Sequence, residues 1–376
     1  MIKVINILSD TNIGGAGRLL VNYLHNFDRT KIDGKVILPK DSQLKPYIEA
    51  EGYEVIETEH GRDKSFDMKA MREIQAILRR EKPDIVHTHS AFSGKLAAFL
   101  CGVPVRFYTR HSAFPQPKKL TTFPGKQING FINSTLATDI VAVAEAAKDN
   151  LTETGVPEKK ITVIINGSEE VRRTTAEEQA ELKKSLKIAD TTFVCGISAR
   201  LEDYKGHSYL LDTMAEVFRR HPDTVLLIIG GGTQEDALKA QAERLGIADK
   251  VIFTGFVHDV APYYNIMNLN LNCSWGTETS CLALSEGMSI GLPAIATTYG
   301  GNPYMITEGV NGCLVPEKDS PAMAQAICRV MEDKDGFDEL KKGARRMYEE
   351  KFTARVMTEQ LEALYEAAVE RTKRTK

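Results

Sequence analysis

The sequence lacks any cysteine pattern that would indicate a disulfide framework. Its six cysteines lie mostly inside apolar runs, and no two of them form a C-x-x-C pair. Such cysteines are typical of a chain kept reduced in the cytosol. No apolar run approaches the roughly 18 residues of a membrane-spanning helix. The N-terminal stretch MIKVINILSD enters an expected strand directly and has no features of a signal peptide. We therefore expect a cytoplasmic protein.

The chain also lacks a strong excess of either charge. Its formal net charge is −3, with 26% charged and 42% hydrophobic residues, which is ordinary for a globular protein. Residues 1–167 carry 23 Lys and Arg against 19 Asp and Glu, and the remainder carries 25 against 32. This excess is too small to indicate a nucleic-acid partner, but a face of the first half suits an anionic surface. With 376 residues, two domains are expected.

Short β-branched runs alternate with amphipathic segments along the whole chain, which predicts two doubly wound parallel sheets with a ligand in the cleft between them. The turn dipeptide Asn166-Gly167 indicates domains at 1–167 and 168–352, and a C-terminal helix over about 353–376 is expected to pack back on the first domain. Strands are expected at residues 3–8, 35–38, 54–57, 85–89, 105–109, 139–142, 161–165, 193–198, 225–229, 251–253, 269–273, 293–296 and 313–315.

Two glutamates follow the buried strand expected at 269–273. Residues 274–301 are predicted to form a polar turn, a short helix and another strand, so the turn lies where open α/β sheets bind ligands. If Glu278 and Glu286 were both helical, their side chains would be offset by about 80° and ~12 Å along the axis. Two such carboxylates suit an elongated, hydroxyl-rich ligand. The helix start near Ser280 to Leu282 suits a phosphate.

Two cations, Arg200 and Lys205, follow the strand expected at 193–198. At the carboxyl end of a strand they suit a diphosphate, which they would stabilise as it departs. Solvated loop charges are the competing interpretation. Paired glutamates also occur in glycoside hydrolases, but such a site has no need of a diphosphate-binding pair or of two matched domains.

The run GGAGR at residues 14–18 follows the first expected strand and opens a helix. Small residues there let a ligand approach the backbone, although a tight turn without a ligand is the alternative. The run is not G-x-G-x-x-G, so nicotinamide binding is poorly supported. His87, His89 and His111 lie at the ends of two strands. A zinc site lacks a clear further ligand, whereas His111 is well placed as a hydrogen-bonding group.

Two further segments bear on metal and membrane binding. Residues 333–335 form the one D-x-D in the sequence and are interpreted as solvated charges, so no metal is expected. Residues 113–131 combine three phenylalanines with three lysines in what is expected to be a proline-broken loop. Aromatic residues beside cations suit peripheral contact with an anionic membrane. A mobile loop over the acceptor explains the same composition.

In combination, these motifs resemble glycosyltransferase family four, retaining enzymes with the GT-B fold of two Rossmann-like domains, over nearly the whole chain. The matched motifs are E-x7-E at Glu278 and Glu286, R-x4-K at Arg200 and Lys205, the glycine-rich loop at 14–17, the N-G at 166–167 and the glycine pair at 300–301. The chain departs from the family after Glu278, where T-S-C stands in place of a glycine-containing G-F-G. This puts the donor hexose and the role of Cys281 in question.

The resemblance implies metal-independent, cofactor-free transfer of a hexose from a UDP- or GDP-sugar to a carbohydrate or lipid-linked acceptor, as in surface polysaccharide synthesis. The alternatives are a nucleotide-sugar 2-epimerase of the same fold and a non-catalytic nucleotide-sugar binding protein. The residues implied are Glu278, Arg200, Lys205 and His111 in catalysis; Glu286, Thr279, Ser280, Cys281, Leu282, Gly15, Phe256 and Val257 in donor binding; and Gly14 and Arg18 in acceptor binding. Among these, Glu286 would bind the ribose, Arg200 and Lys205 the pyrophosphate, and Phe256 and Val257 would flank the base.

Overall fold

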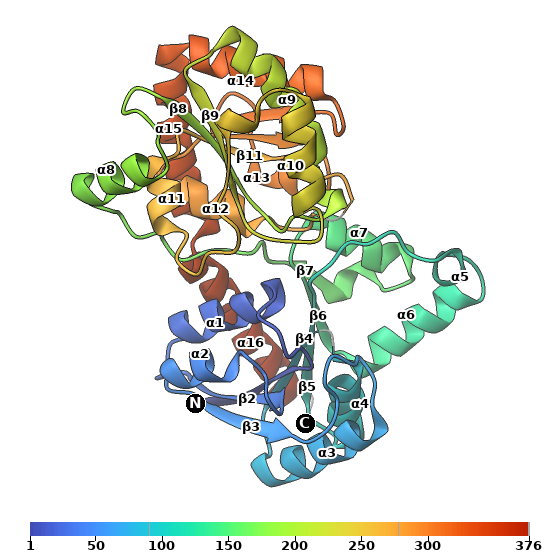
Figure 1. Ribbon diagram of the computed structural model, residues 1–376. Coiled ribbons are helices and arrows are strands. Elements are labelled where there is room, and N and C mark those ends of the chain that lie inside the picture. The colour runs from blue at the N-terminus through green and yellow to red at the C-terminus, as the bar shows by residue number, and fades with distance from the viewer. Residues whose placement is uncertain (90, 277, 375–376) are drawn as a thin grey trace. The chain divides into compact units, whose positions relative to one another are not determined.

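The computed structural model describes residues 1–89, 91–276 and 278–374. The chain divides into two compact units, of which unit 1 comprises residues 1–167 with 354–376, and unit 2 comprises residues 168–353. Each unit has one parallel sheet with helices on both faces (Figure 1). The expectation of an α/β chain with two parallel sheets is therefore confirmed.

The sheet of unit 1 has, within the described residues, seven strands in the order β3-β2-β1-β4-β5-β6-β7. All seven expected strands are confirmed, with small differences at their ends. The strands are β1 (Ile2–Leu8), β2 (Ile32–Pro39), β3 (Glu54–Thr58), β4 (Ile85–His89), β5 (Val105–Arg110), β6 (Asp139–Ala142) and β7 (Ile161–Val163). The helices are α1 (Gly15–Asn26), α2 (Lys45–Ala50), α3 (Met68–Glu81), α4 (Phe92–Leu100), α5 (Lys118–Thr121), α6 (Gly125–Leu136), α7 (Glu145–Glu153), η1 (Glu158–Lys160) and α16 (Ala354–Arg374).

The alternation of apolar residues in β1 explains why this sheet is covered on both faces. Val4 and Leu8 pack into a cluster with α1 and α16, whereas Ile5 and Ile7 pack into another with α3 and α4. Successive side chains of a strand point to opposite faces, so a strand buried on both sides must be apolar throughout. The C-terminal helix α16 completes the first of these layers with Met357, Leu361, Tyr365 and Ala368, which recur at helical spacing.

The sheet of unit 2 has, in the described part of the chain, six strands in the order β10-β9-β8-β11-β12-β13, and it confirms the remaining expected strands. Its strands are β8 (Phe193–Ser198), β9 (Thr224–Ile229), β10 (Val251–Phe253), β11 (Leu269–Asn272), β12 (Ala294–Thr297) and β13 (Gly312–Val315). Its helices are α8 (Ala176–Ser185), η2 (Asp203–Lys205), α9 (His207–Arg220), α10 (Glu235–Arg244), η3 (Ala248–Lys250), α11 (Ala261–Ile266), α12 (Leu282–Ser289), α13 (Asn302–Met305), α14 (Ser320–Glu332), α15 (Lys334–Met347) and η4 (Tyr348–Phe352).

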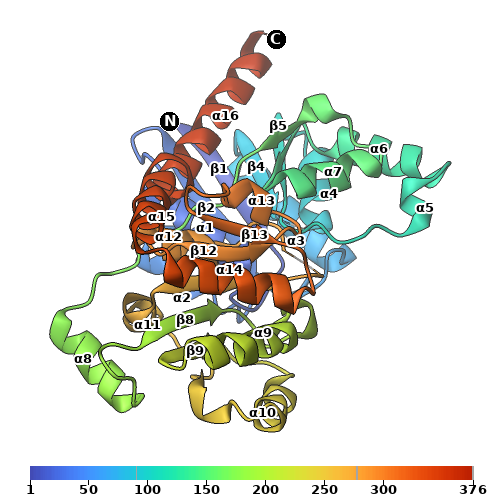
Figure 2. The ribbon, with the colours of Figure 1, turned by 90° about the horizontal axis from the view of Figure 1, so that it is seen from above.

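The prediction of a loop at residues 113–131 is wrong. Residues 113–131 contain α5 and the first half of α6, because Pro117 and Pro124 stand at the residue before each helix, where a proline interrupts no helical hydrogen bond. Both helices lie at the outer edge of unit 1, away from α1 and α2, in Figures 1 and 2. None of the helices in the described residues is long and apolar enough to cross a bilayer.

The D-x-D segment has a structural role in unit 2. Asp333 ends α14 and caps α15, and its carboxylate accepts a hydrogen bond from the Gly336 N–H. An aspartate at this position satisfies a free N–H of the first helical turn. The segment is thus accounted for by helix capping.

Strand order reverses at one place in each sheet, between β1 and β4 in unit 1 and between β8 and β11 in unit 2. At such a point the connections leave on opposite sides of the sheet and open a crevice at the carboxyl ends of the strands. The segments that follow β8 and β11 carry Arg200, Lys205 and Glu278. The topology therefore brings these residues, 73 to 78 positions apart in the chain, to one crevice of unit 2.

Candidate active site

A buried ion pair lies at this crevice. Lys205 Nζ is 2.8 Å from Glu278 Oε2, and the two side chains are only 17% and 7% exposed. Burial alone would lower the pKa of Lys205, but attraction to the Glu278 carboxylate outweighs burial and holds that pKa above its ordinary value. Lys205 therefore stays cationic at the carboxyl end of β8.

Glu278 lies in the predicted turn before α12, so the offset calculated for two helical glutamates does not apply. Its Oε2 accepts hydrogen bonds from Lys205, from Ser274 Oγ at 2.8 Å and from Asn272 Nδ2 at 3.1 Å. Among the described residues, the side-chain hydrogen bonds to this carboxylate all go to Oε2. One oxygen thus anchors the turn, and the other is left for a ligand.

The short helix η2 fixes the backbone beside Lys205. Trp275 donates its backbone N–H to the Tyr204 carbonyl at 2.9 Å and its indole N–H to the Asp203 carbonyl at 3.0 Å. Arg200 remains exposed and donates to Tyr204 Oη at 2.7 Å. The structure therefore brings both predicted cations next to Tyr204, with Lys205 held firmly and Arg200 at the surface.

The start of α12 supplies free backbone donors. The N–H groups of Ser280, Cys281 and Leu282 have no acceptor among the described residues. Thr279, which precedes them, is half-buried, and its carbonyl lies so close to Gly301 that a Cβ there would overlap it. The first N–H groups of a helix have no partner within the helix and attract anions. The free donors expected at the start of this helix are therefore present next to Glu278.

Cys281 is the buried N-cap of α12, and its thiol accepts a contact from Asn272 Nδ2 at 3.1 Å. Burial, followed by repulsion from Glu278, raises the pKa of Cys281 to about 12, so it is a neutral thiol at physiological pH. A nucleophilic role requires the thiolate. Cys281 is therefore a packing residue beneath the turn that holds Glu278.

Glu286 lies on α12, half-buried, and its position depends on a tyrosine that the sequence did not single out. Tyr264 of α11 is fully buried. Its hydroxyl lies 3.1 Å from Glu286 Oε2, to which it donates, and 3.1 Å from the carbonyl oxygen of Ala283. A buried tyrosine hydroxyl needs a partner. A tyrosine within a short apolar-polar run, PYYN, is a weak signal that could have indicated this role.

Phe256 and Val257 follow β10, at the same edge of the sheet. Phe256 is 70% exposed and packs edge-to-face against His258 at 5.1 Å. Val257 packs against the cluster that contains Ile229 and Tyr264. An exposed aromatic ring beside an anchored valine suits the flat face of a base.

The glycine-rich loop of unit 1 follows β1. Gly14 and Gly15 are exposed, and a Cβ at either would meet nothing within 4 Å, whereas Gly17 packs against Leu44. Arg18 is exposed on the first turn of α1. Only Gly17 is thus required by packing, and the open space at Gly14 and Gly15 agrees with the predicted approach of a ligand.

His87, His89 and His111 form one stacked cluster at the ends of β4 and β5 in unit 1. His87 and His89 lie 4.4 Å apart, and His89 and His111 lie 5.2 Å apart, between ring centres. His87 is buried between Tyr365 Oη and Thr109 Oγ1, both at 2.6 Å. Burial, and after it the Arg110 cation, lowers the pKa of His111 to about 4. Across the described residues, no three His, Cys, Asp or Glu side chains are arranged to hold a metal ion.

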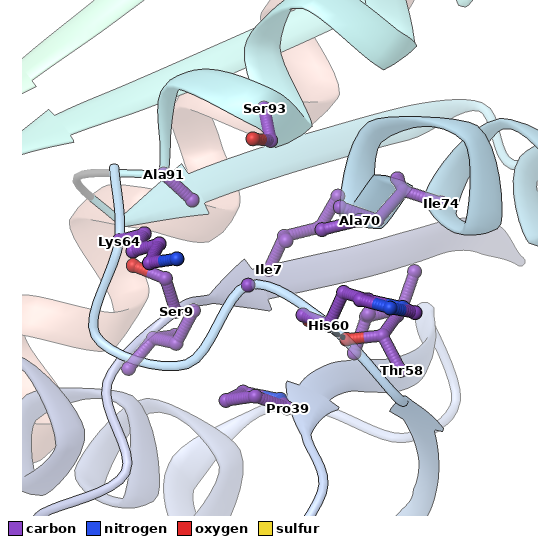
Figure 3. Close-up of a pocket in the computed structure, with 13 residues that line it drawn as sticks. Ile7, Ser9, Pro39, Thr58, His60, Lys64, Ala70, Ile74, Ala91 and Ser93 are labelled. Carbon is purple, nitrogen blue, oxygen red and sulfur yellow. Dashed lines mark hydrogen bonds between the residues drawn. The ribbon is translucent and has the colours of Figure 1, made fainter. Parts of the chain in front are cut away.

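A hollow at the carboxyl ends of β1 to β4 is a feature that sequence reasoning missed. It is small, with room for about one water molecule, and it opens to solvent. Apolar side chains, among them Ile7, Ala70 and Ile74, and polar side chains line it together (Figure 3). The lining includes Ser9, Thr58, His60, Lys64 and Ser93.

Comparison with known proteins agrees with this geometry. The family model "Glycosyltransferase Family 4" matches residues 13–170, and "Glycosyl transferases group 1" matches residues 178–347. An Escherichia coli UDP-Gal:alpha-D-GlcNAc-diphosphoundecaprenol alpha-1,3-galactosyltransferase is 28% identical over 71% of each chain. The Staphylococcus aureus capsular polysaccharide biosynthesis glycosyltransferase CapM is 24% identical over 80% of each chain.

Solved structures extend the agreement to the fold. Anabaena Alr3699/HepE in complex with UDP superposes with a TM-score of 0.83 at 21% identity, covering 98% of this chain and all of that one. A glycosyltransferase from Rickettsia africae superposes with a TM-score of 0.85 at 20% identity, covering 98% of both. The predicted GT-B fold is confirmed by these neighbours. With both units matched by glycosyltransferase models and the matched motifs at the crevice of unit 2, the chain belongs to glycosyltransferase family 4.

Proposed function

We propose that this glycosyltransferase moves a hexose from a UDP- or GDP-sugar to a carbohydrate or lipid-linked acceptor, with retention of anomeric configuration and without a metal. The observation that carries the proposal is the buried Lys205–Glu278 pair beside the free N–H groups of α12, at the crevice where the strand order of unit 2 reverses. This arrangement supplies fixed positive charge and a positioned carboxylate at one place.

The charge at the crevice suits a departing nucleoside diphosphate. In the proposed complex Arg200, Lys205 and the start of α12 bind the diphosphate, so developing negative charge meets preorganised donors. These groups offset the diphosphate charge that a metal ion neutralises in other transferases. Glu278 then presents Oε1 to the sugar. The T-S-C segment at residues 279–281 carries backbone donors for the diphosphate.

The rest of the donor is assigned to groups at the same edge of the sheet. Glu286, oriented by Tyr264, binds the ribose hydroxyls, and Phe256 with Val257 flanks the base. His111 of unit 1 hydrogen-bonds the transferred sugar. Gly14 and Arg18 serve the acceptor. The relatives named for UDP-galactose and for capsular polysaccharide, and the UDP complex of HepE, support this choice of donor and acceptor class.

A donor panel tests the function. The protein is incubated with UDP- and GDP-sugars in the presence of EDTA, and binding is followed by thermal shift and by the fluorescence of Trp275, the one tryptophan in the sequence. A donor at a hundred times its Kd stabilises the protein by about 2.7 kcal/mol. Slow release of nucleoside diphosphate and free sugar supports transfer. Conversion of one sugar to its 2-epimer supports the epimerase, and saturable binding without turnover supports the binding protein.

Glu286→Ala tests the donor site in the same assay. We expect donor binding to weaken by about 1–3 kcal/mol, the cost of leaving a hydrogen-bonding partner unpaired. Glu235→Ala is the matched control, because Glu235 is a surface glutamate of α10 that pairs with Lys239. Equal donor affinity in the Glu286 and Glu235 variants, measured by calorimetry, would contradict the ribose assignment.

We further propose that α5 and α6 contact an anionic membrane. The sequence has no Asp or Glu between residues 85 and 138, a segment that carries six Lys and Arg. Phe123 is 82% exposed, Phe131 72% and Ile128 55%. Apolar side chains that stand out from a basic segment suit shallow insertion between anionic headgroups. The lipid-linked acceptor class named for the relatives agrees with a membrane-facing unit 1.

Vesicle binding by the double variant Phe123→Ser/Phe131→Ser checks this surface. Because each buried phenylalanine contributes about 1.5–3 kcal/mol, the partition coefficient to phosphatidylglycerol vesicles should fall at least about tenfold per residue. Tyr47→Ser is the control, since Tyr47 is a 48% exposed aromatic residue on α2 of the same unit. Sedimentation with neutral phosphatidylcholine vesicles measures the contribution of charge. If the double variant and Tyr47→Ser bind anionic vesicles equally, the surface is not the membrane contact.

A further inference from the structure

A hydrogen-bonded chain of three side chains runs from the sheet of unit 1 to His111. Asn6 of β1 presents Oδ1 to His89 Nε2 at 3.2 Å, and His89 Nδ1 lies 3.0 Å from His111 Nε2. Asn6 is 1% and His89 1% exposed, whereas His111 is half-buried. The chain therefore begins in the core and ends at a histidine that a ligand can reach.

The atoms at each contact determine where the protons lie. Asn6 faces His89 with its amide oxygen, and its buried Nδ2 has no hydrogen-bond partner among the described residues. An amide oxygen can only accept, so in this amide orientation His89 carries its proton on Nε2. In a neutral imidazole the other nitrogen is then an acceptor, so His89 Nδ1 receives the Nε2 proton of His111. His111 Nδ1 is consequently left as a bare acceptor, and it has no hydrogen-bond partner among the described residues.

Both rings are neutral, which this proton arrangement requires. Burial, followed by the neighbouring His87 and His111, holds the pKa of His89 well below its ordinary value. Burial is also the main cause of the low pKa of His111. A charged His89 would still donate to Asn6, but its Nδ1 would carry a proton and could no longer accept from His111 Nε2.

His87 shows that burial among these rings does not by itself determine a tautomer. It stacks on His89, but its two nitrogens contact the hydroxyls of Tyr365 and Thr109. A hydroxyl both donates and accepts, so either tautomer of His87 is satisfied. The amide oxygen of Asn6 removes that freedom for His89. Asn6 reaches it because β1 pairs with β4 in the register Asn6 opposite His87.

We propose that His89, directed by Asn6, is a positioning residue that holds His111 in the tautomer protonated at Nε2, so that His111 Nδ1 accepts a hydrogen bond from a hydroxyl of the transferred sugar. The inference rests on the proposed function for the contact between His111 and the sugar. The tautomer itself is a property of unit 1 and is measured without any substrate.

Long-range proton–nitrogen NMR of the full chain labelled at histidine tests the tautomer. We expect His89 and His111 both to be protonated at Nε2 and bare at Nδ1. In Asn6→Asp, which offers only oxygen acceptors, the same pattern should persist. In His89→Phe, the His111 signals should shift toward a mixture of tautomers. A wild-type His111 protonated at Nδ1 would overturn the proposal, whatever the enzyme's activity.

Kinetics of three variants separate positioning from structure. His89→Phe should lower kcat by about ten- to hundredfold, as for the loss of a residue that orients a functional histidine, with a smaller change in the donor KM. His89→Asn keeps an acceptor where Nδ1 stood and should restore most of kcat. His87→Gln is the control for a buried change in the same cluster, and should lower the melting temperature without altering the His111 tautomer. Equal kcat for His89→Phe and His87→Gln at matched stability would overturn the proposal.

Discussion

Lys205→Ala should lower kcat by about 10²–10³-fold, the loss typical of one preorganised donor to developing charge. The same change should destabilise the protein by about 3–5 kcal/mol, because it leaves a buried carboxylate without its counter-charge. Both effects follow from one contact, the 2.8 Å pair of Lys205 with Glu278. The donor KM should change less than kcat, since the charge on the leaving diphosphate grows in the transition state.

A second variant separates the two effects of this substitution. In Lys205→Met/Glu278→Gln neither side chain is charged, and the amide oxygen of glutamine still accepts from Ser274 and Asn272. Replacement of both members of a buried pair is often neutral for stability. Chemical denaturation should therefore show the stability largely recovered, whereas turnover should remain at the level of Lys205→Ala.

The matched control is Lys239→Ala, which removes an exposed lysine paired with Glu235 on the surface of unit 2. Surface pairs of this kind contribute about 0–1 kcal/mol, so both kcat and the denaturation midpoint should stay near the wild-type values. If the double variant recovered kcat along with stability, Lys205 would be a purely structural residue. The assignment of the diphosphate to this crevice would then be wrong.

The fold was predictable because its signals are local. An apolar run such as VLLII at residues 225–229 predicts a strand without knowledge of its neighbours. These residues are apolar because β9 is covered on both faces. The prediction of a loop at 113–131 is wrong because it treats every proline in the segment as the end of regular structure. Pro117 and Pro124 instead stand directly before the first residues of α5 and α6. Proline marks both the start of a helix and its interruption, and sequence alone does not separate them.

The site was predictable only in part, for a different reason. Strand ends identified Arg200, Lys205 and Glu278 as residues of one edge, but their pairing depends on β8 lying next to β11, a contact across 73 residues. The roles of Tyr264 and Asn6 depend on helix docking and on strand register, which side-chain identity does not encode. The motifs thus indicate which residues bind, whereas tertiary structure determines which atoms of Glu278 and His111 remain available.

Gly206→Ala should lower kcat by on the order of 100-fold without removing any charged group. Gly206 has φ +75°, and a Cβ there would overlap the carbonyl oxygen of Cys273 at the end of β11. The left-handed backbone costs about 1–2 kcal/mol for alanine, and the overlap adds about 1–3 kcal/mol of overpacking. Since Lys205 is the preceding residue, relief of the overlap must displace it. A displacement of about 1 Å from a reacting group costs on the order of 100-fold in rate.

Gly246→Ala isolates the backbone contribution. Gly246 has φ +68°, close to that of Gly206, but a Cβ at this position meets nothing within 4 Å. The Gly246→Ala variant should therefore be destabilised only by the cost of the left-handed conformation, about 1–2 kcal/mol, and should retain full kcat. The difference between the two variants measures the close approach of the Lys205 segment to β11. Were Gly206→Ala as mild as Gly246→Ala in both denaturation and turnover, the rigid placement of Lys205 against Glu278 would not be what activates the leaving diphosphate.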